Sequence, residues 1–200
     1  MSENEGSHDP QGQETDEQLM AAFARGSTDA FNTLFARYKQ PLFGFFWRRI
    51  ADRSQAEELT QETFLALFKA QGRYEATALF RTYLYAIALR ILRTYRRKAT
   101  FRAMFWGTPK PDQEPGASMP LDAEIALREA MGQLDRVARE ILMLREYEEL
   151  SYAEIAALLR IPVNTVRSRL FRARTALRET LAAPAPGLGQ REFSKMEGRA

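Results

Sequence analysis

The feature that most constrains the fold of this 200-residue chain is the spacing of its apolar residues. From about residue 16 to about residue 98 they recur at intervals of three and four, as in Phe31, Leu34 and Phe35. Such spacing places apolar side chains on one face of an α-helix, and no stretch alternates convincingly as a strand does. The sequence therefore predicts an all-α fold whose first half is a bundle of packed helices.

A turn-rich stretch divides this helical pattern in two. Residues 103–120 contain four of the nine prolines and two glycines, without a sustained period. We therefore predict two small helical domains, at 16–100 and 121–183, joined by a flexible linker at 101–120. The second domain is predicted to contain four helices, over 121–133, 136–147, 151–160 and 164–182. The acidic leader 1–15 and the tail 184–200 bury little, so disorder is expected in the leader and a loose tail at the other end.

Charge is segregated along the chain. The 29 basic and 26 acidic residues give a net charge of only +3, but residues 1–24 contain no Lys or Arg, whereas residues 81–102 contain seven basic residues and no acid. A local basic field attracts polyanions even when the whole protein is nearly neutral. Nucleic acid, or an acidic membrane surface, is therefore the first class of partner to consider.

Several kinds of chemistry are excluded or disfavoured by composition. The chain has no cysteine, so it has no disulfide, thiol chemistry or thiolate-bound zinc, and its one histidine, His8, lies in a polar segment where solvation is expected. We expect no cofactor and no bound metal. The N-terminus lacks the pattern of a signal peptide, and no run reaches the roughly 18 apolar residues of a membrane span, so a cytoplasmic protein is expected.

A basic helix is predicted over residues 80–98. Its projection puts six apolar or aromatic residues on one stripe, namely Leu84, Ile87, Ala88, Ile91, Leu92 and Tyr95. The opposite side presents Arg90, Arg93 and Arg97, whose planar, permanently charged guanidinium groups suit phosphate. An ordinary solvated face is the alternative, but surface helices usually mix signs and this one has no acid.

Aromatic residues accompany these arginines. Tyr74, Phe80, Tyr83 and Tyr85 lie beside the basic residues in the sequence. Unstacked bases bind aromatic side chains next to positive charge, which favours a nucleic-acid surface. Each of these rings could equally belong to the core.

Residues 151–182 have the pattern of a helix-turn-helix. Ser151 and Glu154 form a capping-box sequence, and Pro162 ends the first helix because it lacks an amide donor. Either Asn164 or Thr165 is expected to cap the second helix. The predicted inward side chains are Ile155, Ala156 and Leu159 on the first helix and Val166, Leu170, Ala173, Leu177 and Leu181 on the second.

The outward side of the second helix carries the candidate base-reading residues. Arg167, Ser168, Phe171 and Arg172 lie near its N-terminus, the part that enters the major groove in helix-turn-helix proteins. Arginine binds guanine edges and serine adapts to several bases. Arg174 and Arg178, further along, are better placed for phosphates, or are simply solvated charges.

Two motif sets together resemble a known family. The string LSYAEIAALLRIPVNTVRSRLFRARTALR, residues 150–178, resembles region 4 of bacterial sigma factors of the extracytoplasmic-function (ECF) group. QAEELTQETFLALFKA, residues 55–70, resembles region 2.2, and FRTYLYAIALRILRTYRR, residues 80–97, resembles regions 2.3 and 2.4. The resemblance implies a transcription-initiation subunit without catalysis, which binds the clamp and flap of core RNA polymerase and selects promoter DNA.

The resemblance also assigns candidate residues. For the −35 element they are Asn164, Thr165, Arg167, Ser168, Phe171, Arg172, Arg174 and Arg178. For the −10 element they are Phe80, Arg81, Tyr83, Arg90, Arg93 and Arg97. For the polymerase clamp they are Glu58, Gln61 and Glu62, which without the resemblance would be interpreted as a solvated face. It further implies an anti-sigma factor as partner and a cytoplasmic, nucleoid-associated location.

The chain departs from the family pattern at a few positions. Tyr83 replaces the usual Trp, Leu89 and Arg90 replace a frequent Arg-Asn pair, Thr94 replaces a frequent Asp, and Gln55 replaces an acid. These changes affect the expected −10 preference more than the overall role. The alternatives are a plain helix-turn-helix transcriptional regulator and a sigma-like decoy that binds an anti-sigma factor. An enzyme is the least expected class, because the chain lacks a plausible catalytic histidine and a phosphate-binding glycine loop.

Overall fold

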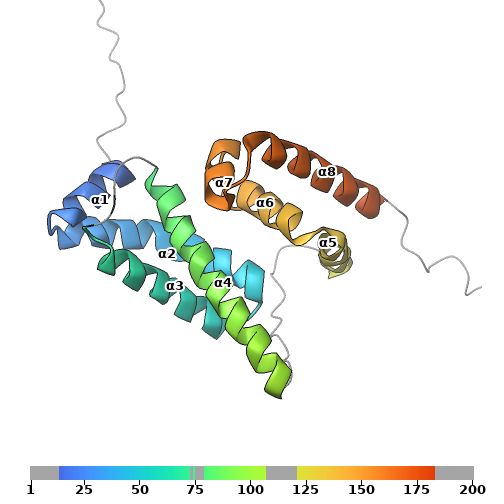
Figure 1. Cartoon of the computed structure of the whole chain (residues 1–200), viewed down its shortest axis with the longest axis horizontal. Helices are drawn as coiled ribbons and strands as arrows, with labels where there is room; N and C mark the ends of the chain where they lie inside the picture. Colours follow the sequence, from blue (N-terminus) through green and yellow to red (C-terminus); the bar gives the residue numbers. More distant parts are fainter. Residues whose placement is uncertain (1–13, 73, 75–78, 107–120, 183–200) are drawn as a thin grey trace, which may run out of the picture. The chain divides into compact units, whose positions relative to one another are not determined.

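The computed structural model describes residues 14–72, 74, 79–106 and 121–182, with side chains omitted at 102–106 and 121–125. Within these ranges the chain forms eight α-helices and no strand, which confirms the predicted all-α class (Figure 1). The chain divides into two compact units, Met1–Glu114 and Pro115–Ala200. The predicted leader, most of the linker and the tail lie outside the described residues, except for Glu14 and Thr15.

Four helices form the first unit: α1 (Asp16–Ala24), α2 (Thr28–Ile50), α3 (Arg53–Lys69) and α4 (Phe80–Trp106). The first three each begin at a side-chain cap, in which Thr15, Ser27 and Asp52 accept a backbone amide of the first turn. Caps of this kind satisfy amides that have no partner inside the helix. Gly26, at φ 102°, makes the tight turn between α1 and α2.

The core of the first unit lies where α2, α3 and α4 meet. α2 packs against α1 and α3, and α4 packs against α3 and α1, as Figure 1 shows. The fully buried side chains include Leu34, Leu42, Phe45, Phe46, Leu67, Leu84 and Leu92. The predicted stripe of α4 is confirmed from Leu84 to Leu92, whereas Tyr95 is only half-buried.

Two acids at the start of α1 form hydrogen bonds with α2 and with the first turn of α4. The Asp16 carboxylate accepts hydrogen bonds from Arg37 Nη1, at 2.7 Å, and from the Tyr38 hydroxyl. Burial, and then this hydrogen bond, raise the pKa of Tyr38 far above its ordinary value. The neighbouring Glu17 Oε1 accepts the amide of Phe80 at 3.0 Å, so α1 also holds the first turn of α4.

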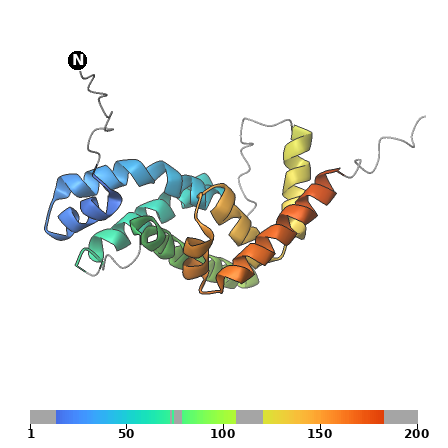
Figure 2. The ribbon, with the colours of Figure 1, turned by 90° about the horizontal axis from the view of Figure 1, so that it is seen from above.

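Four further helices form the second unit: α5 (Leu121–Gln133), α6 (Arg136–Glu146), α7 (Tyr152–Leu159) and α8 (Val163–Ala182). α8 packs against the other three, and Figure 2 shows α5 crossing beside its C-terminal half. The buried side chains include Ile141, Leu144, Leu150, Ile155, Val166, Leu170 and Ala173. The four helices predicted from the sequence are confirmed to within one residue at each end.

Three details of the predicted helices are wrong. α4 continues to Trp106, so the linker predicted from residue 101 starts inside a helix, because the first breaker after Lys98 is Gly107. Asn164 and Thr165 do not cap α8, since the helix starts at Val163 and the Pro162 carbonyl accepts the Thr165 amide at 2.9 Å.

The third detail concerns the inward stripe of α8. Leu181 was expected to face inward but is 47% exposed in the last turn of the helix, where few neighbours cover it. Leu177, and Leu159 on α7, are only half-buried.

None of the helices in the described parts of the chain is long and apolar enough to cross a membrane.

Candidate DNA-binding and protein-binding surfaces

The start of α7 and the turn that follows it are built as the sequence predicts. Ser151 Oγ accepts the Glu154 amide at 3.2 Å, and Glu154 Oε2 accepts the Ser151 amide at 2.8 Å, which confirms the capping box. Arg160 ends α7 in the left-handed region, at φ 57°, and the Ile161 amide returns to the Ala156 carbonyl at 3.0 Å. These bonds fix where α7 stops and how the chain enters α8.

The N-terminal half of α8 presents the four predicted base-reading side chains to solvent. Arg167, Ser168, Phe171 and Arg172 are all exposed, and Phe171 is 71% exposed, so this ring is not part of the core. Their hydrogen bonds stay within the helix: Arg167 Nη1 donates to Asn164 Oδ1 at 3.1 Å, and Arg172 Nε donates to the Ser168 carbonyl at 3.4 Å. The exposed side of α8, away from its buried residues, is thus a polar, cationic surface with one aromatic ring.

Two other arginines of α8 are held by acids of the same unit. Arg174 donates to Glu146 Oε1 on α6 from Nη2 at 2.6 Å and from Nε at 3.1 Å. Arg169 Nη1 donates to Asp135 Oδ1 at 3.2 Å. The bond to Glu146 raises the pKa of Arg174 above its ordinary value. Sequence reasoning missed both acids, because a projection of α8 alone does not show which neighbours flank it.

Asp135 has a second role as the N-cap of α6. Its Oδ1 accepts the amides of Val137 at 2.9 Å and Ala138 at 3.0 Å. The Ala138 amide has the largest effect and lowers the pKa of Asp135; burial opposes it, but the Val137 amide and the charges of Arg169 and Arg172 also lower this pKa, which stays below its ordinary value. The same carboxylate therefore starts α6 and restrains Arg169.

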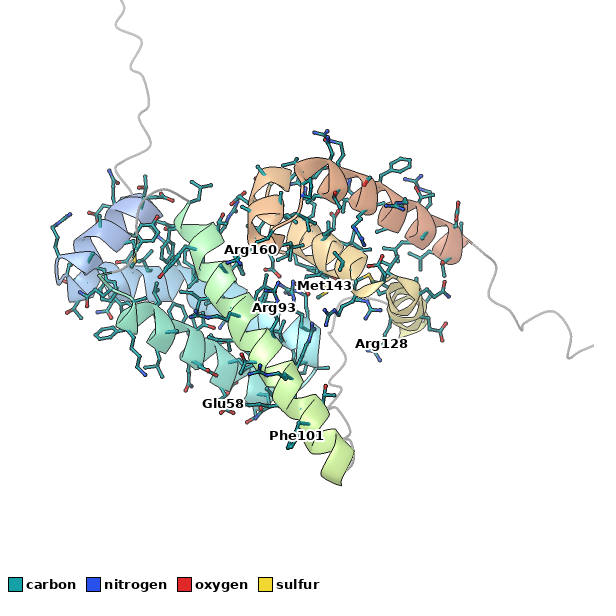
Figure 3. All side chains as sticks on the ribbon, in the orientation of Figure 1. Glu58, Arg93, Phe101, Arg128, Met143 and Arg160 are labelled. Carbon is teal, nitrogen blue, oxygen red and sulfur yellow. The ribbon has the colours of Figure 1, made fainter. Side chains whose placement is uncertain are left out.

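The basic side of α4 is exposed as predicted. Arg90, Arg93 and Arg97 are all exposed, opposite the buried stripe, and Figure 3 labels Arg93 on this helix. Arg81 and Tyr83, nearer the start of the helix, are half-buried. The Tyr83 ring lies 5.2 Å from that of Tyr74, centroid to centroid. The arrangement offers guanidinium groups along the helix and two aromatic rings at its beginning.

Phe80 does not fit the role predicted for it. Its side chain is fully buried, with its ring 5.4 Å from Tyr38 and 6.3 Å from Tyr74. Tyr85 is 3% exposed and lies against Phe45. Both rings thus belong to the core, and the structure places Phe80 away from the surface on which a DNA contact was predicted.

The three predicted clamp-binding residues lie on one exposed ridge of α3. Glu58, Gln61 and Glu62 are exposed, and the Gln55 side-chain amide donates to Glu58 Oε2 at 3.0 Å. Two apolar residues continue the ridge: Leu65 is 59% exposed and Phe68 is 51% exposed. Sequence reasoning missed Leu65 and Phe68, although Leu65 lies seven residues after Glu58, on the same side of the helix.

The three predicted residues line two different grooves, one on each side of this ridge. Glu58 and Glu62 line a groove of about 620 Å³ between α3 and α4, whose other wall includes Arg97 and Phe101. Figure 3 labels Glu58 and Phe101. Gln61 lines a different groove, of about 370 Å³ between α2 and α3, which is lined also by Phe35, Phe43 and Phe64. The two acids, Glu58 and Glu62, therefore lie close to the basic side of α4. Gln61 instead lines a groove that contains aromatic side chains.

The second unit has an apolar groove of its own. It measures about 390 Å³ and lies between α5, α6 and α8. Its apolar lining is Leu127, Met131, Leu142 and Leu177. The Glu146–Arg174 ion pair also borders this groove, beside Tyr147, which is 52% exposed. An apolar floor with charged groups at its border suits a protein partner.

Together these surfaces have the charge and exposure typical of a helical protein that binds DNA and protein partners. Comparison with known proteins specifies the class. The family description "Sigma-70 region 2" matches residues 34–102, and "Sigma-70, region 4" matches residues 124–177. The RNA polymerase sigma-H factor of Pseudomonas aeruginosa is 34% identical over 183 residues, which is 84% of this chain and 95% of that protein. Sigma factor CarQ of Myxococcus xanthus is 33% identical over 166 residues, covering 81% and 95% of the two chains.

A solved structure agrees with this result. CnrH, determined in complex with the cytosolic domain of CnrY, superposes with a TM-score of 0.63 at 26% identity, over 84% of this chain and 97% of that chain. The chain therefore belongs to the sigma-70 family of RNA polymerase sigma factors, in its extracytoplasmic-function group. Sigma factors direct transcription initiation at promoters and are not enzymes. Matches to both regions separate this chain from a plain helix-turn-helix regulator.

Proposed function

We propose that the second unit reads the −35 element as duplex DNA through the N-terminal half of α8. The observation that carries this proposal is the exposed set of Arg167, Ser168, Phe171 and Arg172 on a helix whose other side is buried. Arginine side chains reach guanine edges in the major groove, and Phe171 offers an apolar contact for a thymine methyl group. The rigid turn from α7 sets the angle at which this helix enters the groove.

The arginines of α8 divide into two roles in this proposal. Arg167 and Arg172 read bases, whereas Arg178, exposed near the C-terminal end, contacts phosphate. Loss of a base-reading arginine costs roughly 1–3 kcal/mol and relaxes specificity at one position, while loss of a phosphate contact weakens all sequences and lowers the salt dependence.

Arg172→Ala and Arg178→Ala form a matched pair for this test, since both remove an exposed arginine from one helix. Binding of each holoenzyme to several promoter variants is measured at several salt concentrations. Arg172→Ala should change the ranking of promoters, and Arg178→Ala should lower every affinity and reduce the salt slope. Identical behaviour of the two proteins would contradict the division of roles.

The first unit is proposed to bind the −10 element through the basic side of α4. Arg90, Arg93 and Arg97 would contact the backbone, and the half-buried Tyr83 would meet an unstacked base at the beginning of the helix. Arg93→Ala should reduce strand opening, measured by permanganate reactivity of promoter thymines, without changing −35 recognition. Arg25→Ala, which removes an exposed arginine from the end of α1, is the control. Equal opening by the two variants would argue against α4.

Core polymerase is proposed to bind the exposed ridge of α3. Carboxylates and an amide there pair with basic groups of a partner helix, and Leu65 adds an apolar contact. Glu58→Gln should weaken capture of core polymerase, whereas Asp29→Asn, which removes an exposed acid from the first turn of α2, should not. If the wild-type chain fails to bind core where a control sigma factor binds, the whole proposal fails.

The remaining partners follow from family membership. We propose that the second unit also contacts the polymerase flap and that an anti-sigma factor binds the chain, since CnrH was determined in complex with the cytosolic domain of CnrY. The protein would then act in the cytoplasm at the nucleoid, by binding rather than by catalysis. Transcript profiling after overexpression tests the regulatory role, because the induced genes should share two promoter elements upstream.

A further inference from the structure

The five arginines of α8 are not equally available to DNA. Arg167, Arg172 and Arg178 are exposed and have no ion pair within the described part of the second unit. Arg174 instead gives two hydrogen bonds to Glu146, at 2.6 and 3.1 Å. Both side chains of this pair are about half exposed, at 46% and 47%, so the pair lies at the surface and not in the core.

We propose that Glu146 is a positioning residue, which holds Arg174 away from DNA phosphates and so limits the sequence-independent part of DNA binding by the second unit. The inference rests on the proposed binding of α8 to DNA. Phosphate contacts supply essentially all of non-specific affinity, and each one adds to the salt dependence. A second unit that neutralises one phosphate fewer binds DNA of every sequence more weakly and with a smaller salt dependence, while the base contacts of Arg167 and Arg172 are unchanged.

The geometry of the pair supports this role. Glu146 is the last residue of α6, and Arg174 lies on the flank of α8, between its buried and its groove-facing sides. From the flank an arginine side chain reaches either a neighbouring helix or the DNA backbone. A half-exposed ion pair adds little to stability, so removal of its acid should leave the fold intact and take from Arg174 its charged partner on α6.

Arg169 and Asp135 form a second pair of the same kind on the other flank, at 3.2 Å. Because Asp135 also caps α6, its removal would change the fold as well as the charge. Glu146 has no such second role in capping, which makes it the cleaner residue to change.

The test uses the full-length chain and a 30-base-pair duplex of random sequence, with binding measured between 50 and 200 mM salt. Glu146→Gln should bind several-fold more tightly at the lowest salt, and the slope of log K against log salt should steepen by about 0.9, the value for one added phosphate contact. Glu146→Ala is the second variant, since a glutamine oxygen can still accept from the guanidinium. Glu129→Gln, an exposed acid of α5 outside the pair, is the control for the change in net charge.

A double-mutant cycle with Arg174→Gln decides the mechanism. If Glu146 acts by holding Arg174, the gain disappears when Arg174 is already absent. An unchanged slope in both Glu146 variants overturns the inference, and so does a gain that persists without Arg174 or is matched by Glu129→Gln. If the wild-type chain binds no duplex at 50 mM salt, the proposed function of α8 fails too. If the wild-type chain binds the duplex but the Glu146 variants keep the wild-type salt slope, this inference is refuted and the proposed function of α8 stands.

Discussion

The cap of α4 by Glu17 provides a sharp test of how the first unit is held together. α4 begins at Phe80, and the preceding residue, Leu79, has no side-chain oxygen that could cap it. The acceptor comes from another helix instead, since Glu17 Oε1 on α1 accepts the Phe80 amide at 3.0 Å. Replacement of Glu17 removes both this acceptor and a negative charge from the N-terminal end of the helix dipole.

The magnitude follows from these two contributions. Loss of a helix N-cap costs about 0.5–2 kcal/mol. A carboxylate at a helix N-terminus contributes about 0.3–1 kcal/mol through the dipole. Glu17→Ala should therefore lower the free energy of unfolding by about 1–2 kcal/mol, as the cap is its main loss. Glu17→Gln keeps an acceptor and loses only the charge, so it should cost about 0.3–1 kcal/mol.

Urea unfolding followed by tryptophan fluorescence measures this cost in the intact chain. Both tryptophans, Trp47 and Trp106, belong to the first unit, so the signal reports that unit alone. Glu14→Ala is the matched control, because its structural contact is a backbone carbonyl, which accepts from Arg37 at 3.0 Å. The cap hypothesis is refuted if Glu17→Ala and Glu14→Ala unfold at the same urea concentration.

Three further predictions concern the second unit. Leu170→Ala empties a site that is 1% exposed and should destabilise this unit by about 2–5 kcal/mol, seen as an early loss of helical circular dichroism on heating. Ser151→Ala breaks the capping box of α7 and should cost about 1 kcal/mol in the same assay, with Ser151→Thr close to wild type. Backbone amides, chiefly that of Ala138, hold the pKa of Asp135 below its value in the unfolded chain. The Asp135 carboxylate therefore stabilises the fold fully above about pH 4, and this stabilisation is lost as the pH falls through the lowered pKa. The melting temperature of Asp135→Asn should consequently fall less on acidification than that of wild type.

The elements that could be predicted from the sequence are those whose signals are local. The helices of the second unit were predicted to within one residue because each has its own start or stop, such as the Ser151 cap and the breaker Pro162. The helical period also separated buried from exposed sides, so Val166 and Leu170 are buried and Arg167 and Phe171 are exposed. A period of 3.6 residues carries this information without any knowledge of tertiary structure.

Phe80 shows where local reasoning fails. Basic and aromatic residues near it suggest a base-stacking surface, but proximity in the sequence does not say which side of a helix an aromatic ring takes. The first turn of α4 is held against α1 by Glu17, and this places Phe80 beneath Tyr38 and Tyr74. Only the packing of α1, sixty residues away, decides that Tyr83 and not Phe80 lies near the surface.

The same limit explains the arginines of α8. Projection of a single helix distinguishes an inward from an outward side. Whether a residue on the flank forms an ion pair depends instead on the side chains of the neighbouring helices. Arg174 and Arg178 look equivalent in the sequence, yet α6 ends in Glu146 beside the first of them and holds it. The acids beside the first residue and at the last residue of α6 thus decide which arginines of α8 form ion pairs. In this chain an acid that contacts no base is predicted to limit how strongly the second unit binds DNA of any sequence.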